Sequence, residues 1–257
     1  MKVDFYKHSL GQAEIDSVAE AINSVFLSAG PKTAAFEKQF AAMYDAKYCV
    51  GVTSWTMGNF IALKALGIGP GDEVITTPMS FVATANTVLY CGATLVLVDV
   101  DADTGNIDLA KVKAAITPRT KAILPVHLYG QMVDMKALHA MTAGTNIHVL
   151  EDCAHAVESV RDGVKPSQLS KAAVFSFYAT KNLACGEGGA IVTNDETLYQ
   201  QLLVYRLHGM NKSAADRYHS TYKHWDLELL GWKCNMNHIQ AAMLLPQLAR
   251  LPAQLAR

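Results

Sequence analysis

The 257-residue sequence lacks several features that define whole classes of protein. It has only five cysteines and no Cys-x-x-Cys pair, which argues against a zinc site and against a disulfide framework. No run of about 18 uninterrupted apolar residues occurs, and the first eight residues lack the apolar stretch of a signal peptide. These absences predict a cytoplasmic protein with buried reduced thiols, no metal and no membrane contact.

Neither sign of charge is in excess. With 22 basic and 23 acidic residues, the formal net charge of −1 gives no electrostatic reason to bind nucleic acid or anionic membranes. Hydrophobic residues make up 51% of the chain, so it is able to bury a large core. The expected partner is therefore a small molecule.

Two common chemistries also lack their motifs. No Gly-x-Gly-x-x-Gly follows any expected strand, which argues against a nicotinamide-binding fold. No Gly-x-Ser-x-Gly elbow is present, so acyl transfer by a catalytic serine is set aside.

The chain does contain regularly alternating apolar runs and amphipathic segments. Seven expected strands cover residues 47–54, 72–77, 94–101, 120–129, 148–152, 172–177 and 189–193. Expected helices cover residues 57–66, 83–90, 109–116 and 135–141, and an N-terminal helical arm (1–46) contains two more, at 14–27 and 33–44. This alternation predicts an α/β fold with a mostly parallel seven-stranded sheet between helices. Ligands of such sheets bind beyond the carboxyl ends of the strands.

Lys181 is the most informative residue, because it lies between two apolar strands and just before the Gly-rich turn at 186–189. Partial burial lowers the pKa of a lysine, and its neutral amine can form a Schiff base with a carbonyl group. Asp152 ends another apolar strand, where a buried carboxylate requires a cationic partner. Together with nearby His155, these residues predict a pyridoxal phosphate site in which Lys181 holds the aldehyde and Asp152 pairs with the ring nitrogen.

Other candidates each have an ordinary structural alternative. Ser54, Trp55 and Thr56 open an expected helix and could bind a phosphate, although such a hydroxyl is more often a plain helix cap. Ser176 could reach the same phosphate or be a turn residue.

The aromatic and imidazole candidates are similarly ambiguous. Phe81 could stack on a flat cofactor ring or pack in the core. His155 could hydrogen-bond a phenolic oxygen of the cofactor or be an ordinary polar residue near a strand end.

Motifs along nearly the whole chain resemble the sugar aminotransferases of fold type I, which use pyridoxal phosphate to aminate keto-sugars attached to nucleotides. The matching segments are Gly30-Pro31 with Phe36-Glu37, 66–75, Gly92-Ala93 with 98–101, 116–123, 151–156, 175–182, 187–189 and His208-Gly209. Residues 54–58, 151–156 and 233–235 look most like the branch that makes UDP-4-amino-4-deoxy-L-arabinose.

The resemblance implies a role for each candidate. Lys181 would carry the cofactor and later move the proton, Asp152 would keep the ring nitrogen protonated, Phe81 would stack on the ring and His155 would lie near its hydroxyl. The phosphate would be held by Trp55, Thr56 and Ser176, with Lys233 or Asn235 from a second subunit. The resemblance thus implies a homodimer with shared active sites, glutamate as amino donor, and a role in making lipopolysaccharide or a related cell-surface glycan.

Three departures from the family pattern stand out. Trp55 occupies a position where the family has Gly or Ala, which is expected to alter the backbone's approach to the phosphate. Pro246 is expected to interrupt a helix at 239–251, because proline inside a helix costs about 3 kcal/mol or more. The chain ends at Arg257, where the family continues into a small C-terminal domain.

These departures lead to an expected domain division and to alternatives for function. Residues 1–238 are expected to form the large cofactor-binding domain, and 239–257 the start of a helix leading to a C-terminal domain that is absent. The alternatives are a fragment or a catalytically silent or regulatory relative. A related dehydratase is disfavoured, because those enzymes replace the Schiff-base lysine with histidine and Lys181 is present.

Overall fold

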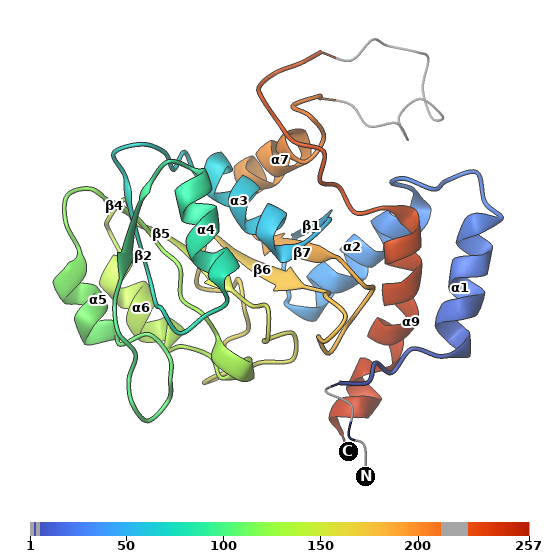
Figure 1. Cartoon of the computed structure of the whole chain (residues 1–257), viewed down its shortest axis with the longest axis horizontal. Coiled ribbons are helices and arrows are strands. Elements are labelled where there is room, and N and C mark those ends of the chain that lie inside the picture. The colour runs from blue at the N-terminus through green and yellow to red at the C-terminus, as the bar shows by residue number, and fades with distance from the viewer. Residues whose placement is uncertain (1–2, 4–5, 212–225, 257) are drawn as a thin grey trace.

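A computed structural model describes residues 3, 6–211 and 226–256, and its centre is a seven-stranded sheet (Figure 1). The strands are β1 (Tyr48–Val52), β2 (Glu73–Thr76), β3 (Thr94–Leu97), β4 (Thr120–Ile123), β5 (His148–Asp152), β6 (Ala172–Ser176) and β7 (Gly189–Thr193). Their order is β1-β7-β6-β5-β4-β2-β3, and only the pairs made by β7 are antiparallel. The predicted mostly parallel sheet is confirmed, with all seven strands near their expected positions.

Helices cover both faces of the sheet because successive strand residues point to opposite sides. On one face, Val50 and Val174 pack with α3 (Trp55–Ala65), α4 (Val82–Tyr90) and α7 (Glu196–Tyr205). On the other face, Phe175 packs with α2 (Pro31–Met43) and α9 (His238–Leu255), while Ile123 and Val149 pack with α5 (Leu109–Ala115) and α6 (Met135–Thr142). A three-residue 3-10 helix, η1 (Leu128–Gly130), follows β4.

The predicted interruption at Pro246 is wrong, because α9 runs through both Pro246 and Pro252. Packing explains this outcome. Leu244 and Leu248, on either side of Pro246, are buried in the same core cluster as the phenylalanines of α2. Gln247 fixes the helix further, since its side chain accepts from the Ala184 N–H (3.0 Å) and donates to the Ala184 carbonyl (2.8 Å). These tertiary contacts outweigh the lost helical hydrogen bond.

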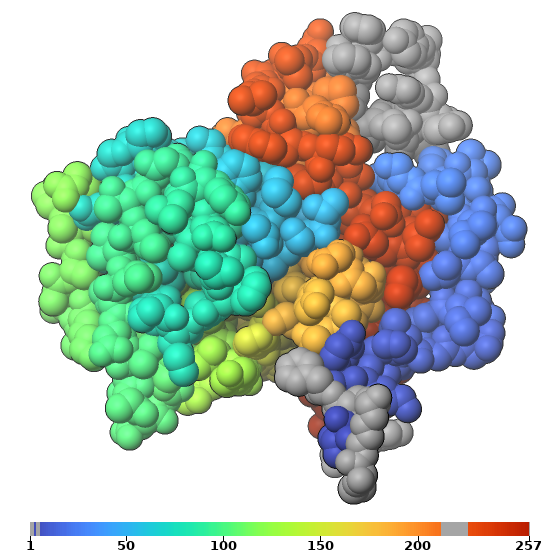
Figure 2. Space-filling model, in the orientation of Figure 1, coloured from blue at the N-terminus to red at the C-terminus, as the bar shows by residue number. Residues whose placement is uncertain are grey.

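The N-terminal arm packs against the last helix of the described chain. Helix α1 (Gln12–Ile22) is shorter than predicted and lies beside α9, where Arg250 forms an ion pair with buried Glu14. In Figure 2 this N-terminal segment, in blue, lies directly against the red helix. The predicted division of the chain at residue 238 stays a prediction. Among the described residues, no helix is long and apolar enough to cross a membrane.

Candidate active site

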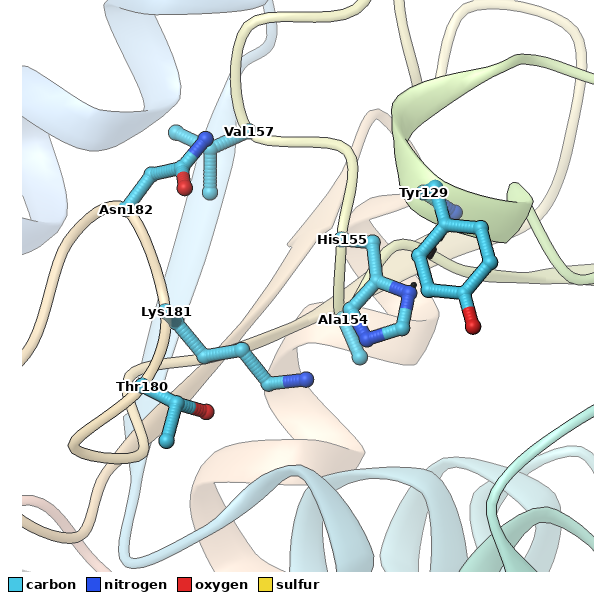
Figure 3. Close-up of a pocket in the computed structure, with 7 residues that line it drawn as sticks. All are labelled: Tyr129, Ala154, His155, Val157, Thr180, Lys181 and Asn182. Carbon is cyan, nitrogen blue, oxygen red and sulfur yellow. Dashed lines mark hydrogen bonds between the residues drawn. The ribbon is translucent and has the colours of Figure 1, made fainter. Parts of the chain in front are cut away.

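Lys181 lies on the loop after β6 and lines a pocket of about 290 Å³. The pocket is lined by Tyr129, Ala154, His155, Val157, Thr180, Lys181 and Asn182. In Figure 3 the Lys181 side chain extends toward His155. The lysine is half-buried, and this burial lowers the pKa of its amine, while the charge of Asp152 acts in the opposite direction. The fraction of neutral, nucleophilic amine is thereby increased at a given pH.

Asp152 ends β5 and is only 4% exposed. Its Oδ1 accepts from the Ala154 N–H (3.1 Å) and its Oδ2 from the Thr84 hydroxyl (2.9 Å). Burial raises the pKa of Asp152 to about 6, although both hydrogen bonds and the nearby His127 and Lys181 act to lower it. The structure therefore places a buried carboxylate within electrostatic reach of Lys181.

His155 is oriented by Tyr129. Its Nδ1 accepts a hydrogen bond from the Tyr129 backbone N–H (3.3 Å), and the two rings stack with centroids 5.4 Å apart and an angle of 4° (Figure 3). Because Nδ1 is an acceptor, the neutral ring carries its proton on Nε2. Burial and the charge of Lys181 lower the pKa of His155, which favours this neutral form. The imidazole thus presents an N–H donor.

The start of α3, the end of β6 and the start of β7 meet at Gly189. A Cβ at this position would lie 2.6 Å from the Ser54 carbonyl carbon and 2.7 Å from the Trp55 nitrogen. Across the sheet, Gly189 pairs with Ser176. The absence of a side chain at Gly189 therefore lets the helix start lie against the strand that carries Ser176. The sequence indicated a Gly-rich turn here but not this close approach.

The residues at the start of α3 have distinct local roles. The Ser54 hydroxyl caps the helix by accepting from the Met57 N–H (3.2 Å), which is the ordinary structural alternative. Trp55 is 6% exposed and packs in the core, and its Nε1 has no acceptor among the described residues. The backbone N–H groups of Trp55 and Thr56 are in the first turn, where a helix offers them no acceptor. Two donors at a positive helix end are thus available to an anion.

Phe81 is the N-cap of α4 and is 77% exposed, so the core-packing alternative is wrong for this residue. Its ring is free to contact another flat group. Two further site residues were missed by sequence reasoning: Thr84, which contacts Asp152, and Tyr129, which contacts His155. Nothing in the local pattern around either residue marks it.

Lys233 and Asn235 lie beside the end of β1 of their own chain. Asn235 forms a bridge with Val52, and the Thr53 N–H donates to the Cys234 carbonyl (2.8 Å). Within this segment the Lys233 amine donates to the Asn235 side-chain oxygen (2.6 Å). Their predicted contribution to a second subunit stays a prediction.

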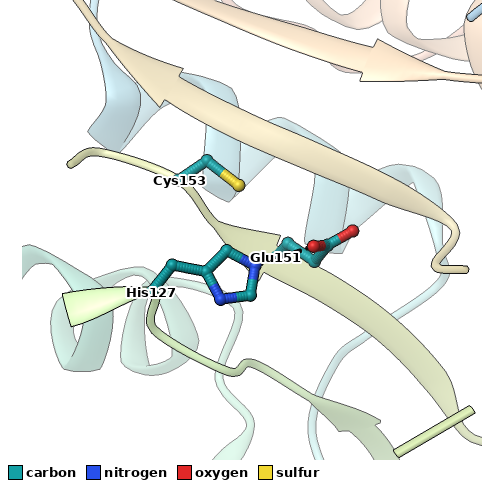
Figure 4. Close-up of side chains that lie close together, drawn as sticks. All are labelled: His127, Glu151 and Cys153. Carbon is teal, nitrogen blue, oxygen red and sulfur yellow. Dashed lines mark hydrogen bonds and ion pairs between the residues drawn. The ribbon is translucent and has the colours of Figure 1, made fainter. Parts of the chain in front are cut away.

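His127, Glu151 and Cys153 form a buried group whose possible ligand atoms lie within 4.8 Å of one another (Figure 4). Glu151 is already satisfied, since it accepts from His127 Nε2 (2.7 Å), the Ser167 N–H (2.7 Å) and the Ser170 hydroxyl. His127 Nδ1 in turn accepts from the Val133 N–H (3.1 Å). These hydrogen bonds explain how the His127 and Glu151 side chains are buried without a metal ion.

The residues of the pocket and those near it fit pyridoxal phosphate. They combine a half-buried amine, a buried carboxylate that requires a cation, an imidazole N–H and a helix start with two backbone donors. The close approach at Gly189 keeps that helix start beside the strand ends.

Two solved structures share this fold over most of the chain. An aminotransferase from Psychrobacter cryohalolentis has a TM-score of 0.89 at 36% identity, covering 95% of this chain and 63% of its own. A candidate sugar aminotransferase from Streptococcus pneumoniae, solved in its pyridoxamine phosphate form, has a TM-score of 0.92 at 30% identity, covering 99% of this chain and 69% of its own. The predicted fold class is confirmed.

Two curated relatives are similar at the sequence level. The spore coat polysaccharide biosynthesis protein SpsC of Bacillus subtilis is 50% identical over 243 residues, which cover 94% of this chain and 62% of that protein. The GDP-perosamine synthase of Caulobacter vibrioides is 42% identical over 244 residues, which cover 95% and 63% respectively. The chain therefore spans less than two thirds of the length of these relatives.

The predicted cofactor and family are both confirmed. The DegT/DnrJ/EryC1/StrS aminotransferases depend on pyridoxal phosphate, and the Streptococcus pneumoniae protein is known in its pyridoxal and pyridoxamine phosphate forms. The sequence profile of this family matches residues 8–257. On this match, and on its identity to the two curated relatives, the chain belongs to the DegT/DnrJ/EryC1/StrS aminotransferase family.

Proposed function

We propose that the protein is a cytoplasmic pyridoxal phosphate-dependent aminotransferase that converts a nucleotide-linked keto-sugar to an amino-sugar, with glutamate as amino donor. The observation that carries this proposal is that Lys181, which lines the pocket, and the buried carboxylate of Asp152 lie close enough for the charge of each to act on the pKa of the other. A lysine with a lowered pKa next to a buried carboxylate is what amine transfer through this cofactor requires.

The bound cofactor supplies an electron sink that stabilises negative charge at the substrate carbon. Lys181 would hold the cofactor and then move a proton between substrate and cofactor carbons. Asp152 would pair with the protonated ring nitrogen, and the His155 Nε2–H would donate to an anionic oxygen. The first N–H groups of α3 and the Ser176 hydroxyl would bind the phosphate, while Phe81 would cover the ring.

The substrate class is supported by the products of relatives. One relative is a GDP-perosamine synthase and another takes part in spore coat polysaccharide biosynthesis, which favours an amino-sugar destined for a cell-surface glycan. The arabinose branch suggested by the sequence motifs stays a prediction. The silent alternative is weakened by the burial of Trp55, since its side chain packs in the core, and not over the helix start.

The first test replaces the proposed cofactor-carrying lysine. Lys181→Ala should fold normally but lose at least about a thousandfold in turnover when keto-sugar nucleotides are screened with glutamate. The exposed Lys47 offers a matched control, and Lys47→Ala should keep wild-type activity.

Chemical labelling provides an independent check of the same assignment. Borohydride reduction of the wild-type protein followed by peptide mapping should attach the cofactor to Lys181. Labelling of another lysine, or wild-type turnover in Lys181→Ala, would show that the assignment is wrong.

A further inference from the structure

Two hydroxyl groups, one just before α4 and one in its first turn, form a hydrogen-bonded chain that ends at the Asp152 carboxylate. Thr84, which is 2% exposed, donates its hydroxyl to Asp152 Oδ2 (2.9 Å). The Ser80 hydroxyl lies 2.6 Å from the Thr84 hydroxyl. An ionised carboxylate accepts hydrogen bonds but donates none, so Thr84 must donate to Asp152. The Ser80 hydroxyl is therefore the donor to Thr84.

We propose that Ser80 and Thr84 are positioning residues that hold Asp152 in the ionised form and in the orientation needed to pair with the cofactor's ring nitrogen. This inference rests on the proposed function. Among the described residues, Thr84 provides the one side-chain hydrogen bond to the Asp152 carboxylate, and the other bond to this carboxylate comes from the Ala154 backbone. A hydrogen bond to a charged acceptor is about twice as strong as one between neutral groups.

The same turn also fixes the residue proposed to cover the cofactor ring. The Thr84 N–H donates to the Phe81 carbonyl (3.0 Å), so Phe81 and the donor to Asp152 belong to one hydrogen-bonded turn. One turn further along α4, the Thr87 hydroxyl accepts from the Asn59 amide of α3 (2.7 Å). Helix α4 is thus tied to α3, and Thr84 hydrogen-bonds both the Phe81 backbone carbonyl and the Asp152 carboxylate.

Other ionisable groups face Asp152 from the elements packed around it. His127 comes from the segment after β4, Lys181 from the loop after β6, and Cys153 follows Asp152 directly. Positive charge on His127 or Lys181 favours the ionised carboxylate, and negative charge on Cys153 opposes it. Because none of these groups changes when Thr84 or Ser80 is substituted, the contribution of the hydroxyl chain can be measured separately.

The test measures the titration of Asp152 in the cofactor-free protein by ¹³C NMR of labelled aspartate carboxyls, with Asp152→Asn identifying the signal. Thr84→Val removes the donor at nearly constant volume and should raise the titration midpoint by about one to two pH units. Thr84→Ser keeps the hydroxyl and should restore the wild-type midpoint. Ser80→Ala should raise it by a smaller amount. In the cofactor-loaded protein, the pH dependence of the visible absorbance should follow the same order.

An unchanged midpoint in folded Thr84→Val would overturn the proposal, as would equal shifts in Thr84→Val and Thr84→Ser, which would indicate a packing role only. If Thr84→Val fails to fold, Ser80→Ala provides the test, because Ser80 is only half-buried. A higher titration midpoint of Asp152 in this variant supports the proposal, and an unchanged midpoint overturns it. Because the titration needs no cofactor, its result is separate from the proposed function, whose failure would appear as wild-type protein that binds no pyridoxal phosphate.

Discussion

At the scale of single residues, Asp152 is expected to destabilise the cofactor-free protein near neutral pH. Burial raises its pKa from 3.8 to about 6, so between these pH values the folded protein keeps a proton that the unfolded chain has lost. Stability therefore falls as the pH rises through this window and stays lower above it. The cationic ring nitrogen of a bound cofactor would pair with the carboxylate and remove this loss of stability. A residue that binds the cofactor can therefore destabilise the cofactor-free protein.

This cost can be measured by urea unfolding of Asp152→Asn without cofactor. We expect the free energy of unfolding of the variant, relative to wild type, to be higher at pH 7 than at pH 4 by up to about 2–3 kcal/mol. Exposed Asp99 is a control of opposite sign, because hydrogen bonds from the Val100 N–H and from Lys111 lower the pKa of its carboxyl. Asp99→Asn should be slightly less stable than wild type at pH 7, and this difference should change little down to pH 4, because a carboxyl with a lowered pKa loses its contribution only below its usual pKa. A pH-independent difference for Asp152→Asn would contradict the argument.

At the scale of elements, the proposed phosphate site depends on how closely the start of α3 approaches the end of β6 and the start of β7. Gly189→Ala would place a Cβ 2.6–2.8 Å from three backbone atoms, of Ser54, Trp55 and Phe175, and none of these is a flexible side-chain end. The helix start must therefore shift. We expect pyridoxal phosphate affinity, measured by titration of the absorbance, to fall by at least about tenfold.

Gly69→Ala is the matched control for this substitution. A Cβ at Gly69 would meet no atom of the described part of the chain within 4 Å, and the Gly69 backbone is outside the left-handed region. Its affinity for the cofactor should equal that of wild type. Equal cofactor affinities for Gly189→Ala and Gly69→Ala would show that the start of α3 does not contribute to cofactor binding.

Helix α9 provides a second prediction at this scale. Pro246 lies in its interior, so Pro246→Ala should restore a backbone donor and raise the free energy of unfolding by about 1–3 kcal/mol. Pro252 is exposed and lies near the end of α9, and Pro252→Ala should give a smaller gain. Thermal or urea unfolding would compare them. A loss of stability in Pro246→Ala would mean that its ring packs too well to replace.

The contrast between Pro246 and the strands shows what the sequence could predict. Alternating apolar runs mark the sheet because the pattern is local, and the same pattern predicts Asp152 at a strand end and Lys181 between two strands. Thr84 and Tyr129 escaped notice because their partners are 68 and 26 residues away in the chain. The predicted interruption at Pro246 is wrong for the same reason. The helix-breaking effect of this proline is local, and it is outweighed by hydrogen bonds of Gln247 to a segment 63 residues away in the chain.

At the scale of the whole molecule, the proposed phosphate site is short of positive charge. Ser176 and the first N–H groups of α3 provide hydrogen bonds but no full cation for a group with a charge near −2. Lys233 and Asn235 are the residues predicted to supply the missing positive charge and a further donor. In this chain they lie beside β1, which leads through Thr53 to the start of α3, and they bind each other. That position is compatible with a site completed within one chain as well as with one completed across a dimer.

Mixing two inactive proteins separates these arrangements. One carries Lys181→Ala, and the other carries Lys233→Ala with Asn235→Ala. If active sites are shared in a homodimer, a 1:1 mixture contains about half mixed dimers, each with one site built from two intact halves. About a quarter of the wild-type activity should therefore return after unfolding and refolding together. Mass spectrometry of differently tagged subunits would establish that mixed dimers form. Mixed dimers without any activity, or a fully active monomer, would show that each site is built from one chain.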